Sequence, residues 1–267
     1  MITETITSQH NPKIKHLLQL QQKSSLRRSE GLFVVEGRRE LMHCMTAGYE
    51  VDTVFILESE VTQEMPALGD AVHVYTVSSQ VYEKIAYRGT TEGIIAVVKT
   101  RHLSLNELSS KSATQSPLYV VLESVEKPGN LGAILRSADA AGVTAVIVCD
   151  PLTDLYNPNL IRSSIGAVFT VPVVACTSEA CISFLKENGV QILTAQLQDS
   201  HLYYDQDMTG SIAIIVGSEG RGMNKLTMKN CDFLVKIPMM GKITSLNASV
   251  SGGIVLFEAL HQRLMKR

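Results

Sequence analysis

The stretch IPMMGKITSLNASVS, residues 237–251, decides how the carboxy-terminal half of this chain is interpreted. A strand-like apolar run ends at Ile237, a polar loop follows, and an apolar helical pattern starts near Ser245. Two earlier segments have the same strand–loop–helix character, EKPGNLG at 126–132 and GSEGRG at 217–222. In open α/β sheets, ligands bind beyond the carboxyl ends of the strands. The three loops therefore predict one composite binding site.

Around these loops the second half of the chain alternates strands with helices. The continuous apolar run at residues 212–216 is typical of a strand buried on both faces, as in a parallel sheet. The last helix is too apolar to lie wholly on the surface, and Ser245 is its expected N-cap. Strands are predicted at 118–122, 145–148, 171–174, 191–195, 212–216 and 233–237, and helices at 131–141, 159–166, 179–188 and 245–265.

The first hundred residues predict a separate, smaller α/β domain. Strands are expected at 32–35, 51–57, 72–77 and 94–98, with helices at 38–47 and 78–86. Apolar residues then thin out between Arg101 and Pro117, where a polar, serine-rich stretch is typical of a linker. We therefore expect domains at 1–100 and 118–267 joined by a linker at 101–117, a size that suits two cores.

Composition points to an ordinary folded cytoplasmic protein. Of the 267 residues, 45% are hydrophobic and 19% charged, which argues against extended disorder. The chain contains no apolar run of about 18 residues and no basic-then-apolar leader, so no membrane segment is expected. The five cysteines are scattered without a CxxC pair, which favours buried free thiols and predicts no metal site.

The net charge of −2 does not indicate a polyanionic partner, but one segment of the chain is basic. Between His10 and Arg39 seven basic residues oppose two acidic ones, a local excess of +5. Such a run is either a solvated face or a patch that binds phosphates, and the sequence leaves both open. The candidate phosphate contacts are Lys13, Lys15, Arg27, Arg28 and Arg38.

Taken singly, each loop also has a purely structural explanation. GSEGRG suits a tight turn; its glycine spacing is not GxGxxG, and Lys236 rather than an acid lies about twenty residues on, which disfavours a dinucleotide site. Asn130 is placed to cap the helix that follows it. Arg136 lies on a largely apolar helix, where it either pairs with Asp139 or binds an anion.

Taken together and in order, the loops resemble the three signature motifs of the SpoU/TrmH family of RNA ribose 2′-O-methyltransferases, in the SPOUT superfamily. The resemblance rests on PGNLG at 128–132 with Arg136, on GSEGRG at 217–222, and on IPM at 237–239 with SLNAS at 245–249. It covers Leu118 to the end of the chain. The first hundred residues, with NP at 11–12 and FVVEG at 33–37, are similar to the RNA substrate-binding domain often fused ahead of it.

The resemblance implies a trefoil-knotted α/β fold, with a mostly parallel sheet, helices on both of its faces and a smaller α/β domain in front. It also implies a homodimer through the carboxy-terminal domain and S-adenosylmethionine as cofactor. By motif, the cofactor-binding residues are Gly217, Glu219, Gly220, Ile237, Met239, Ser245 and Leu246. The residues implied in substrate positioning and chemistry are Asn130, Arg136, Ser245 and Asn247.

The expected reaction is methyl transfer to a ribose 2′-hydroxyl of ribosomal or transfer RNA. Positioning contributes roughly 7–11 kcal/mol to such a step, more than the about 10²–10⁴-fold of a general base. Arg136 acts either as proton acceptor or as an orienting cation. The second role is favoured, because a guanidinium is effectively always protonated. Two alternatives remain: an RNA-binding protein without catalysis, and a methyltransferase that acts on a base nitrogen. The sequence does not identify which nucleotide is methylated.

Overall fold

The structure is a computed structural model that describes residues 2–61, 68–87, 92–109, 116–196, 200–217 and 222–266. The chain forms two compact units. The first comprises Met1–Arg101 and Asp154–Thr170, and the second comprises His102–Thr153 and Val171–Arg267. The two units thus meet in sequence at residue 101, with one segment of the second half assigned to the first unit.

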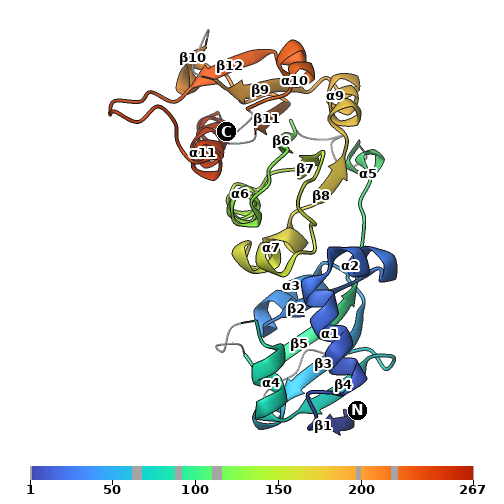
Figure 1. Cartoon of the computed structure of the whole chain (residues 1–267). Coiled ribbons are helices and arrows are strands. Elements are labelled where there is room, and N and C mark those ends of the chain that lie inside the picture. The colour runs from blue at the N-terminus through green and yellow to red at the C-terminus, as the bar shows by residue number, and fades with distance from the viewer. Residues whose placement is uncertain are drawn as a thin grey trace. The chain divides into compact units, whose positions relative to one another are not determined.

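The first unit is built on a mixed sheet of five strands (Figure 1), in the order β1-β4-β3-β5-β2. Strands β1, β4 and β3 run parallel, whereas β5 is antiparallel to both of its neighbours. The strands are β1 (Ile2–Ile6), β2 (Leu32–Glu36), β3 (Val51–Leu57), β4 (His73–Val77) and β5 (Ile94–Lys99). Four of them confirm the predictions, and β1 is an addition.

The helices of this unit follow from local signals. Asn11 caps α1, because its Oδ1 accepts the N–H of Lys13 (2.9 Å) and Pro12 occupies the first turn. Ile14, Leu17 and Leu20 form the buried face of α1 in the core. The helices of the first hundred residues are α1 (Pro12–Gln22), α2 (Ser24–Glu30), α3 (Arg38–Thr46) and α4 (Ser79–Ile85), with a 3₁₀ turn η1 (Glu58–Glu60).

The segment Asp154–Thr170 belongs to the first unit through aromatic packing and one ion pair. It contains α7 (Pro158–Ser163) and α8 (Ala167–Thr170) in place of the single helix predicted at 159–166. The ring centroid of Phe33 lies 4.4 Å from that of Tyr156 and 5.8 Å from that of Phe169. Nearby, Arg27 Nε lies 2.7 Å from Asp154 Oδ2.

The second unit is built on a sheet of seven strands, in the order β10-β12-β9-β11-β6-β7-β8, and all the pairings between its strands are parallel. Every residue of β6, β7 and β11 is buried, which confirms the prediction that these apolar runs are internal strands. The strands are β6 (Leu118–Glu123), β7 (Ala145–Cys149), β8 (Val173–Cys176), β9 (Gln191–Ala195), β10 (His201–Leu202), β11 (Ile212–Val216) and β12 (Phe233–Lys236).

Helices pack against this sheet from both sides. Ile215 lies in the core cluster that holds Leu185 of α9, whereas its neighbour Val216 contacts Gly252 of α11. Since successive side chains of a strand point to opposite faces, α9 and α11 cover different faces. Figure 1 shows α11 beside α6. The helices are α5 (Leu105–Ser109), α6 (Pro128–Ala140), α9 (Ser178–Glu187), α10 (Lys225–Asn230) and α11 (Ala248–Met265), with a 3₁₀ turn η2 (Tyr203–Asp205).

Two helix starts differ from the sequence prediction. The last helix starts at Ala248, and its N-cap is Asn247, whose Oδ1 accepts the N–H of Ser249 at 3.0 Å. Helix α6 starts at Pro128, so Asn130 lies in its first turn instead of capping it. Proline is favoured at the first helical position because it lacks an N–H that would otherwise be unpaired there.

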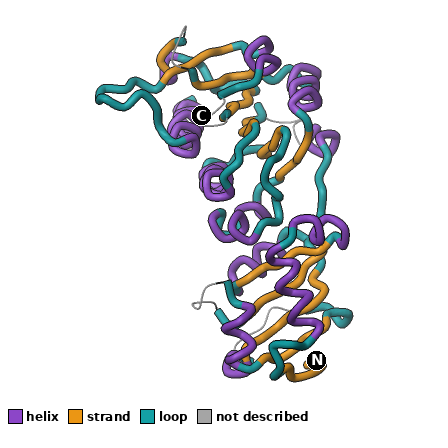
Figure 2. Tube along the Cα trace, viewed as in Figure 1, coloured by secondary structure: helices purple, strands orange, loops and turns teal. Residues whose placement is uncertain are grey.

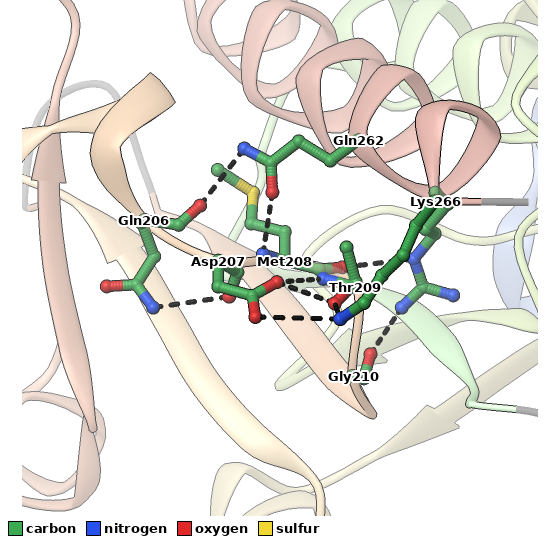
Figure 3. A network of polar contacts seen from close by, with 8 residues as sticks. Gln206, Asp207, Met208, Thr209, Gly210, Gln262 and Lys266 are labelled. Atoms are coloured by element: carbon green, nitrogen blue, oxygen red, sulfur yellow. Dashed lines mark hydrogen bonds and ion pairs between the residues drawn. The ribbon is translucent and has the colours of Figure 1, made fainter.

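The end of α11 is tied to the loop that precedes β11 (Figure 3). Gln262 Nε2 donates to the carbonyl of Gln206 (3.0 Å), and its Oε1 accepts the N–H of Met208 (2.8 Å). Lys266 Nζ donates to Thr209 Oγ1 at 2.7 Å. These bonds hold the helix against the sheet at the end away from its N-cap.

Among the helices that the structure describes, none combines the length and the apolar character needed to cross a bilayer.

Candidate functional site

Two adjoining cavities lie at the carboxyl ends of β9, β11 and β12. The larger, of about 640 Å³, is lined by Ile214–Gly217, by Gly222 and Met223, and by Ser245–Ala248. The smaller, of about 190 Å³, is lined by residues that include Lys236, Ile237, Met239 and Thr244. Both cavities share the walls Ala195, Gln196, Ser245, Leu246 and Ser251. Their position is the one at which parallel α/β sheets bind ligands.

The described residues that the motifs imply in cofactor binding all line these cavities. Gly217 lies in the larger one, Ile237 and Met239 lie in the smaller one, and Ser245 and Leu246 lie in both. Glu219 and Gly220 fall outside the described residues. The walls include residues of the loop between β12 and α11, which Figure 2 draws as a long loop segment. The second and third motif loops therefore meet at one site, while the part each residue plays in binding stays a prediction.

Gly217 permits a close backbone approach within the wall of the larger cavity. A Cβ at this position would lie 2.6 Å from Met223 Sδ and 2.9 Å from the carbonyl oxygen of Gly222. The second distance is to backbone, which cannot rotate away as a side chain does. The atoms that a side chain here would meet belong to the chain itself, where it folds back across the strand end at Gly222 and Met223.

A direct hydrogen bond joins the first motif loop to the third. Asn247 Nδ2 donates to Asn130 Oδ1 at 3.1 Å, although the two residues are 117 positions apart. The oxygen of the same Asn247 amide is also bonded: Oδ1 accepts from the N–H of Ser249, which orients the amide. This bond lies beside the larger cavity, since Asn247 lines it. Two of the four residues implied in catalysis are thus in contact, and the exposed Ser245 lines the same cavity.

Arg136 lies elsewhere on α6. Six residues separate it from Asn130, which is a rise of about 9 Å along the helix and roughly 240° around it. Its side chain is exposed, and the described walls of the two cavities do not include it. Ser245 and Asn247 therefore line the larger cavity, whereas Arg136 is not among its described walls.

The basic residues expected to contact RNA lie in the first unit, and four of them are at least partly exposed. Lys15 and Arg28 are exposed on α1 and α2. Lys13 Nζ pairs with Glu4 at 3.0 Å and lies 4.5 Å from the centroid of the Tyr75 ring. Arg38 is partly buried, and its Nη2 lies 3.3 Å from the carbonyl oxygen of Glu60.

Arg27 does not fit a surface contact with RNA. It is 2% exposed, and its guanidinium donates to Asp154 Oδ2 and to the carbonyls of Leu20 (2.5 Å) and Gln21 (3.1 Å). It is therefore a structural cation that ties α1 and α2 to the segment carrying α7. The sequence grouped it with its basic neighbours because a charge run does not show which helix face each residue occupies.

The first unit also contains a cavity of about 270 Å³. Its walls include Glu36, Arg39, Tyr87 and Arg162. The backbone N–H of Tyr87 donates to Glu36 Oε1 at 3.0 Å, and the Arg162 guanidinium carbon lies 5.9 Å from the centroid of the Tyr87 ring. Burial raises the pKa of Glu36, although the Tyr87 N–H opposes this shift.

Several walls of the larger cavity come from residues that the loop motifs do not include. Ala195 ends β9 and Gln196 follows it, and Met228, Gly252 and Val255 come from α10 and α11. The available signal was the end of the strand predicted at 191–195, because parallel strands place their carboxyl ends along one edge. The helix residues carried no such signal, since apolar residues at helical spacing are typical of any core.

Glu123 was also missed, and it supports the cavity from behind. This carboxylate is 2% exposed and accepts from the N–H of Asn224 (2.8 Å), Thr227 Oγ1 (2.6 Å) and Ser178 Oγ (3.1 Å). Asn224 follows Met223 in the cavity wall and caps α10 through its own side chain. Glu123 therefore holds the return of the second motif loop to the sheet.

Comparison with known proteins assigns families to both parts of the chain. A model of the SpoU rRNA methylase family matches residues 117–257. A model of the MRM3-like substrate-binding domain matches residues 11–96. The 23S rRNA (guanosine-2′-O-)-methyltransferase RlmB of Vibrio cholerae is 41% identical over 210 residues, which cover 78% of this chain and 84% of that protein. The corresponding protein of Pseudomonas putida is 42% identical over 184 residues, covering 67% and 74%.

Solved structures agree over nearly the whole length. A crystal structure of an RNA 2′-O ribose methyltransferase matches with a TM-score of 0.83 and 34% identity, over 97% of this chain and 99% of that one. An AdoMet-bound rRNA methyltransferase from Sinorhizobium meliloti matches with a TM-score of 0.88 and 28% identity, over 97% and 98%. Because a family model covers more than half of the chain, and relatives are about two-fifths identical over two thirds or more of its length, this protein belongs to the SpoU rRNA methylase family.

Proposed function

We propose that this protein transfers a methyl group from S-adenosylmethionine to a ribose 2′-hydroxyl of ribosomal RNA, with a guanosine of 23S rRNA as the first candidate substrate. The observation that carries the proposal is the bond between Asn247 and Asn130 beside the larger cavity, because it joins the first motif loop to the wall of a ligand site. The choice of RNA follows the relatives, which are 23S rRNA guanosine methyltransferases. Transfer RNA is the alternative substrate.

The residues of the two cavities fit S-adenosylmethionine, the cofactor of SpoU methyltransferases. A volume of about 640 Å³ lies within the range of small-molecule sites, and its walls are largely apolar with backbone at the strand ends. Gly217, Leu246 and Ile237 would hold the cofactor through their backbone, with Met239 and Ser245 beside them. When bound, the cofactor supplies an electrophilic methyl group on a sulfonium ion.

The chain's own polar residues would position the RNA. The Asn130–Asn247 pair offers an oriented amide beside the larger cavity, and the exposed Ser245 lines the same cavity. Alignment contributes more to such a step than proton removal does. We therefore assign Asn130, Ser245 and Asn247 to substrate positioning.

We assign Arg136 the role of an orienting cation. Its exposed guanidinium suits a phosphate beside the target ribose and would stabilise negative charge that develops on the attacking oxygen. Arg136→Ala should lower kcat by at least about 100-fold, as loss of such a donor does elsewhere. The dissociation constant of S-adenosylmethionine, measured by calorimetry, should be unchanged. A loss of cofactor affinity as large as the loss of rate would contradict this role. Arg136→Lys is the matched control, because lysine keeps the positive charge but cannot donate the bidentate hydrogen bonds of a guanidinium.

A homodimer through the second unit would bring Arg136 to the site from the partner chain. Three apolar side chains at seven-residue spacing are exposed along α11, namely Val250 (49%), Phe257 (46%) and Leu264 (54%). Such a stripe is typical of a helix that packs against a second helix. Because α11 packs beside α6, a dimer formed on this stripe would place the partner's α6 close to the cavities.

We also propose that the second unit contains the trefoil knot of its superfamily. Support comes from the similarity to solved SpoU structures and from the loops after β9, β11 and β12, which share one edge of the sheet. A crystal structure traced through those three loops tests the threading. Along the sequence, the knotted domain would be residues 118–267, of which Asp154–Thr170 packs in the first compact unit, with 1–100 as the RNA-binding domain and 101–117 as the linker.

RNA binding by the first unit is assigned to Lys13, Lys15, Arg28 and Arg38. Lys15→Glu and Arg28→Glu should weaken binding to ribosomal RNA fragments and reduce the slope of log affinity against log salt by about 0.7–0.9 per contact. Lys99→Glu, on β5, is a matched charge control; its amine already pairs with Glu50 at 2.8 Å. An unchanged slope in the first two variants would remove these residues from the interface.

One labelling experiment separates this function from its two alternatives. RNA incubated with the enzyme and methyl-tritiated S-adenosylmethionine is hydrolysed to nucleosides. We expect the label on ribose; label on a base would indicate a base-nitrogen methyltransferase, and no label would indicate an RNA-binding protein without catalysis. Mapping 2′-O-methyl sites in total RNA from cells with and without the gene then identifies the nucleotide. We place the protein in the cytoplasm, as befits an enzyme of ribosomal RNA.

A further inference from the structure

Three cysteines that are far apart in the sequence come together in the second unit. Cys149 ends β7, Cys176 ends β8, and Cys181 lies in the first turns of α9. Cys149 and Cys176 are direct partners across two parallel strands. The three Sγ atoms all lie within 4.8 Å of one another. The cluster is separate from the two cavities, whose walls include none of these residues among those described.

The arrangement suits a metal ion better than a disulfide. Zinc–sulfur bonds are about 2.3 Å long, so three sulfurs at the corners of a tetrahedron around zinc lie roughly 3.8 Å apart. Sulfur separations of up to 4.8 Å reach this geometry by small rotations of the side chains. A disulfide would use two of the three thiols and leave the third beside it without a role. Thiolates select soft ions such as Zn²⁺ and Cu⁺.

Burial and charge also fit a metal site. Cys149 and Cys181 are 2% and 1% exposed, whereas Cys176 is partly exposed and offers an entry path. Binding of Zn²⁺ would release the three thiol protons to solvent and leave one net negative charge on the cluster. The N-terminus of α9 lies beside Cys176 and Cys181, and the positive end of a helix dipole favours negative charge. Water, which can reach the cluster at the partly exposed Cys176, would supply a fourth ligand.

We propose that Cys149, Cys176 and Cys181 form a thiolate site for one thiophilic metal ion, Zn²⁺ or Cu⁺. The ion clamps the ends of β7 and β8 to the start of α9. Ser178 in that first turn donates to Glu123, which in turn holds Asn224 behind the larger cavity. The site is therefore structural: it stiffens the sheet edge that carries the cavities and takes no part in methyl transfer.

The test is a metal titration of the full chain, reduced and kept without oxygen. Cd²⁺, a spectroscopic probe for zinc thiolates, should bind at one ion per chain and give an ultraviolet thiolate-to-metal charge-transfer band. Native mass spectrometry should show one Zn²⁺ with the loss of bound protons. Competition against a chelator with Zn²⁺ and with Cu⁺ in separate arms tells which ion binds more tightly. Bound Zn²⁺ should raise the unfolding temperature.

Single variants localise the binding. Cys176→Ser, at the partly exposed position, should keep the fold, reduce the charge-transfer band by about a third and weaken metal affinity; Cys149→Ser and Cys181→Ser should do the same. Cys231→Ser is the matched control. Its thiol donates to the carbonyls of Ile192 (3.4 Å) and Phe233 (3.0 Å), bonds that serine keeps, and it lies outside the cluster.

A second measurement covers variants that fail to fold. In the wild-type protein, Zn²⁺ should slow alkylation of Cys176 by iodoacetamide, whereas the labelling of Cys231 should be unaffected. The proposal is overturned if no saturable binding is found, if binding survives in the triple serine variant, or if peptide mapping of the purified protein shows a disulfide within the cluster in place of metal.

Discussion

Replacing the buried Glu123 with alanine should loosen the sheet edge behind the larger cavity. The carboxylate accepts from Asn224 N–H, Thr227 Oγ1 and Ser178 Oγ at 2.8, 2.6 and 3.1 Å. The three donors belong to three different parts of the second unit, namely the return of the second motif loop, α10 and α9. Glu123 thus connects the end of β6 to each of them.

The expected cost follows from what each donor loses. Ser178 loses least, because its hydroxyl also lies 2.5 Å from Asp150 Oδ2. Asn224 is exposed, so water can reach its N–H once the contact is gone. Thr227 is 2% exposed and would keep a buried hydroxyl without this acceptor. An unsatisfied buried group costs about 1–3 kcal/mol, and loss of the charged acceptor for Asn224 adds about 1 kcal/mol. Glu123→Ala should therefore lower the free energy of unfolding by about 2–4 kcal/mol.

Urea unfolding and calorimetric binding of S-adenosylmethionine together check this. If the loss is local to the cavity wall, cofactor affinity should fall by about tenfold for each 1.4 kcal/mol. Glu123→Gln keeps one acceptor oxygen and should show a smaller loss. Glu126→Ala, an exposed carboxylate three residues on, is the control and should change neither quantity. An unfolding midpoint and a cofactor affinity equal to wild type in Glu123→Ala would refute the reasoning.

Gly217→Ala should weaken cofactor binding by about tenfold, because the new Cβ would meet the carbonyl of Gly222 at 2.9 Å and overpacking costs about 1–3 kcal/mol. Calorimetry measures this affinity. Gly129→Ala is the control, because a Cβ at Gly129 has no atom within 4 Å. Arg263→Met should lower the urea midpoint, because its guanidinium donates to the carbonyls of Met208, Ser116 and Gly210, and Arg263→Lys should lie between that variant and wild type. Phe257→Asp should convert the proposed dimer to monomer in sedimentation; a Phe257→Asp protein that still sediments as a dimer would move the interface away from α11.

Much of the fold could be predicted from local pattern. The apolar runs of β6, β7 and β11 indicated buried parallel strands because both of their faces are covered. Short or terminal elements were harder: β1 has only five residues, and its pairing with β4 spans some seventy positions. Helix starts were misplaced by two or three residues, because Ser245 and Asn247 are both good caps and only the path of the chain selects between them.

The candidate site divides in the same way. Residues in polar loops after strands were identifiable, and Gly217, Ile237 and Ser245 do line the cavities. Walls that come from the apolar faces of helices, such as Met228 and Val255, were not identifiable, because their spacing is that of any packed helix. For Arg27 the error was the opposite one: it was predicted to contact RNA, but its side chain is buried. A run of basic residues does not show which of them is buried.

The sequence by itself determined the family, the alternation of strands and helices, and the loops that surround the site, because each depends on residues close together along the chain. Only the tertiary structure decided which distant groups touch. The bond between Asn130 and Asn247, the three donors around Glu123, and the cluster of Cys149, Cys176 and Cys181 all join residues from separate elements. The physical reason is that these contacts depend on strand order and register, and a parallel sheet places neighbours side by side that sequence spacing does not relate.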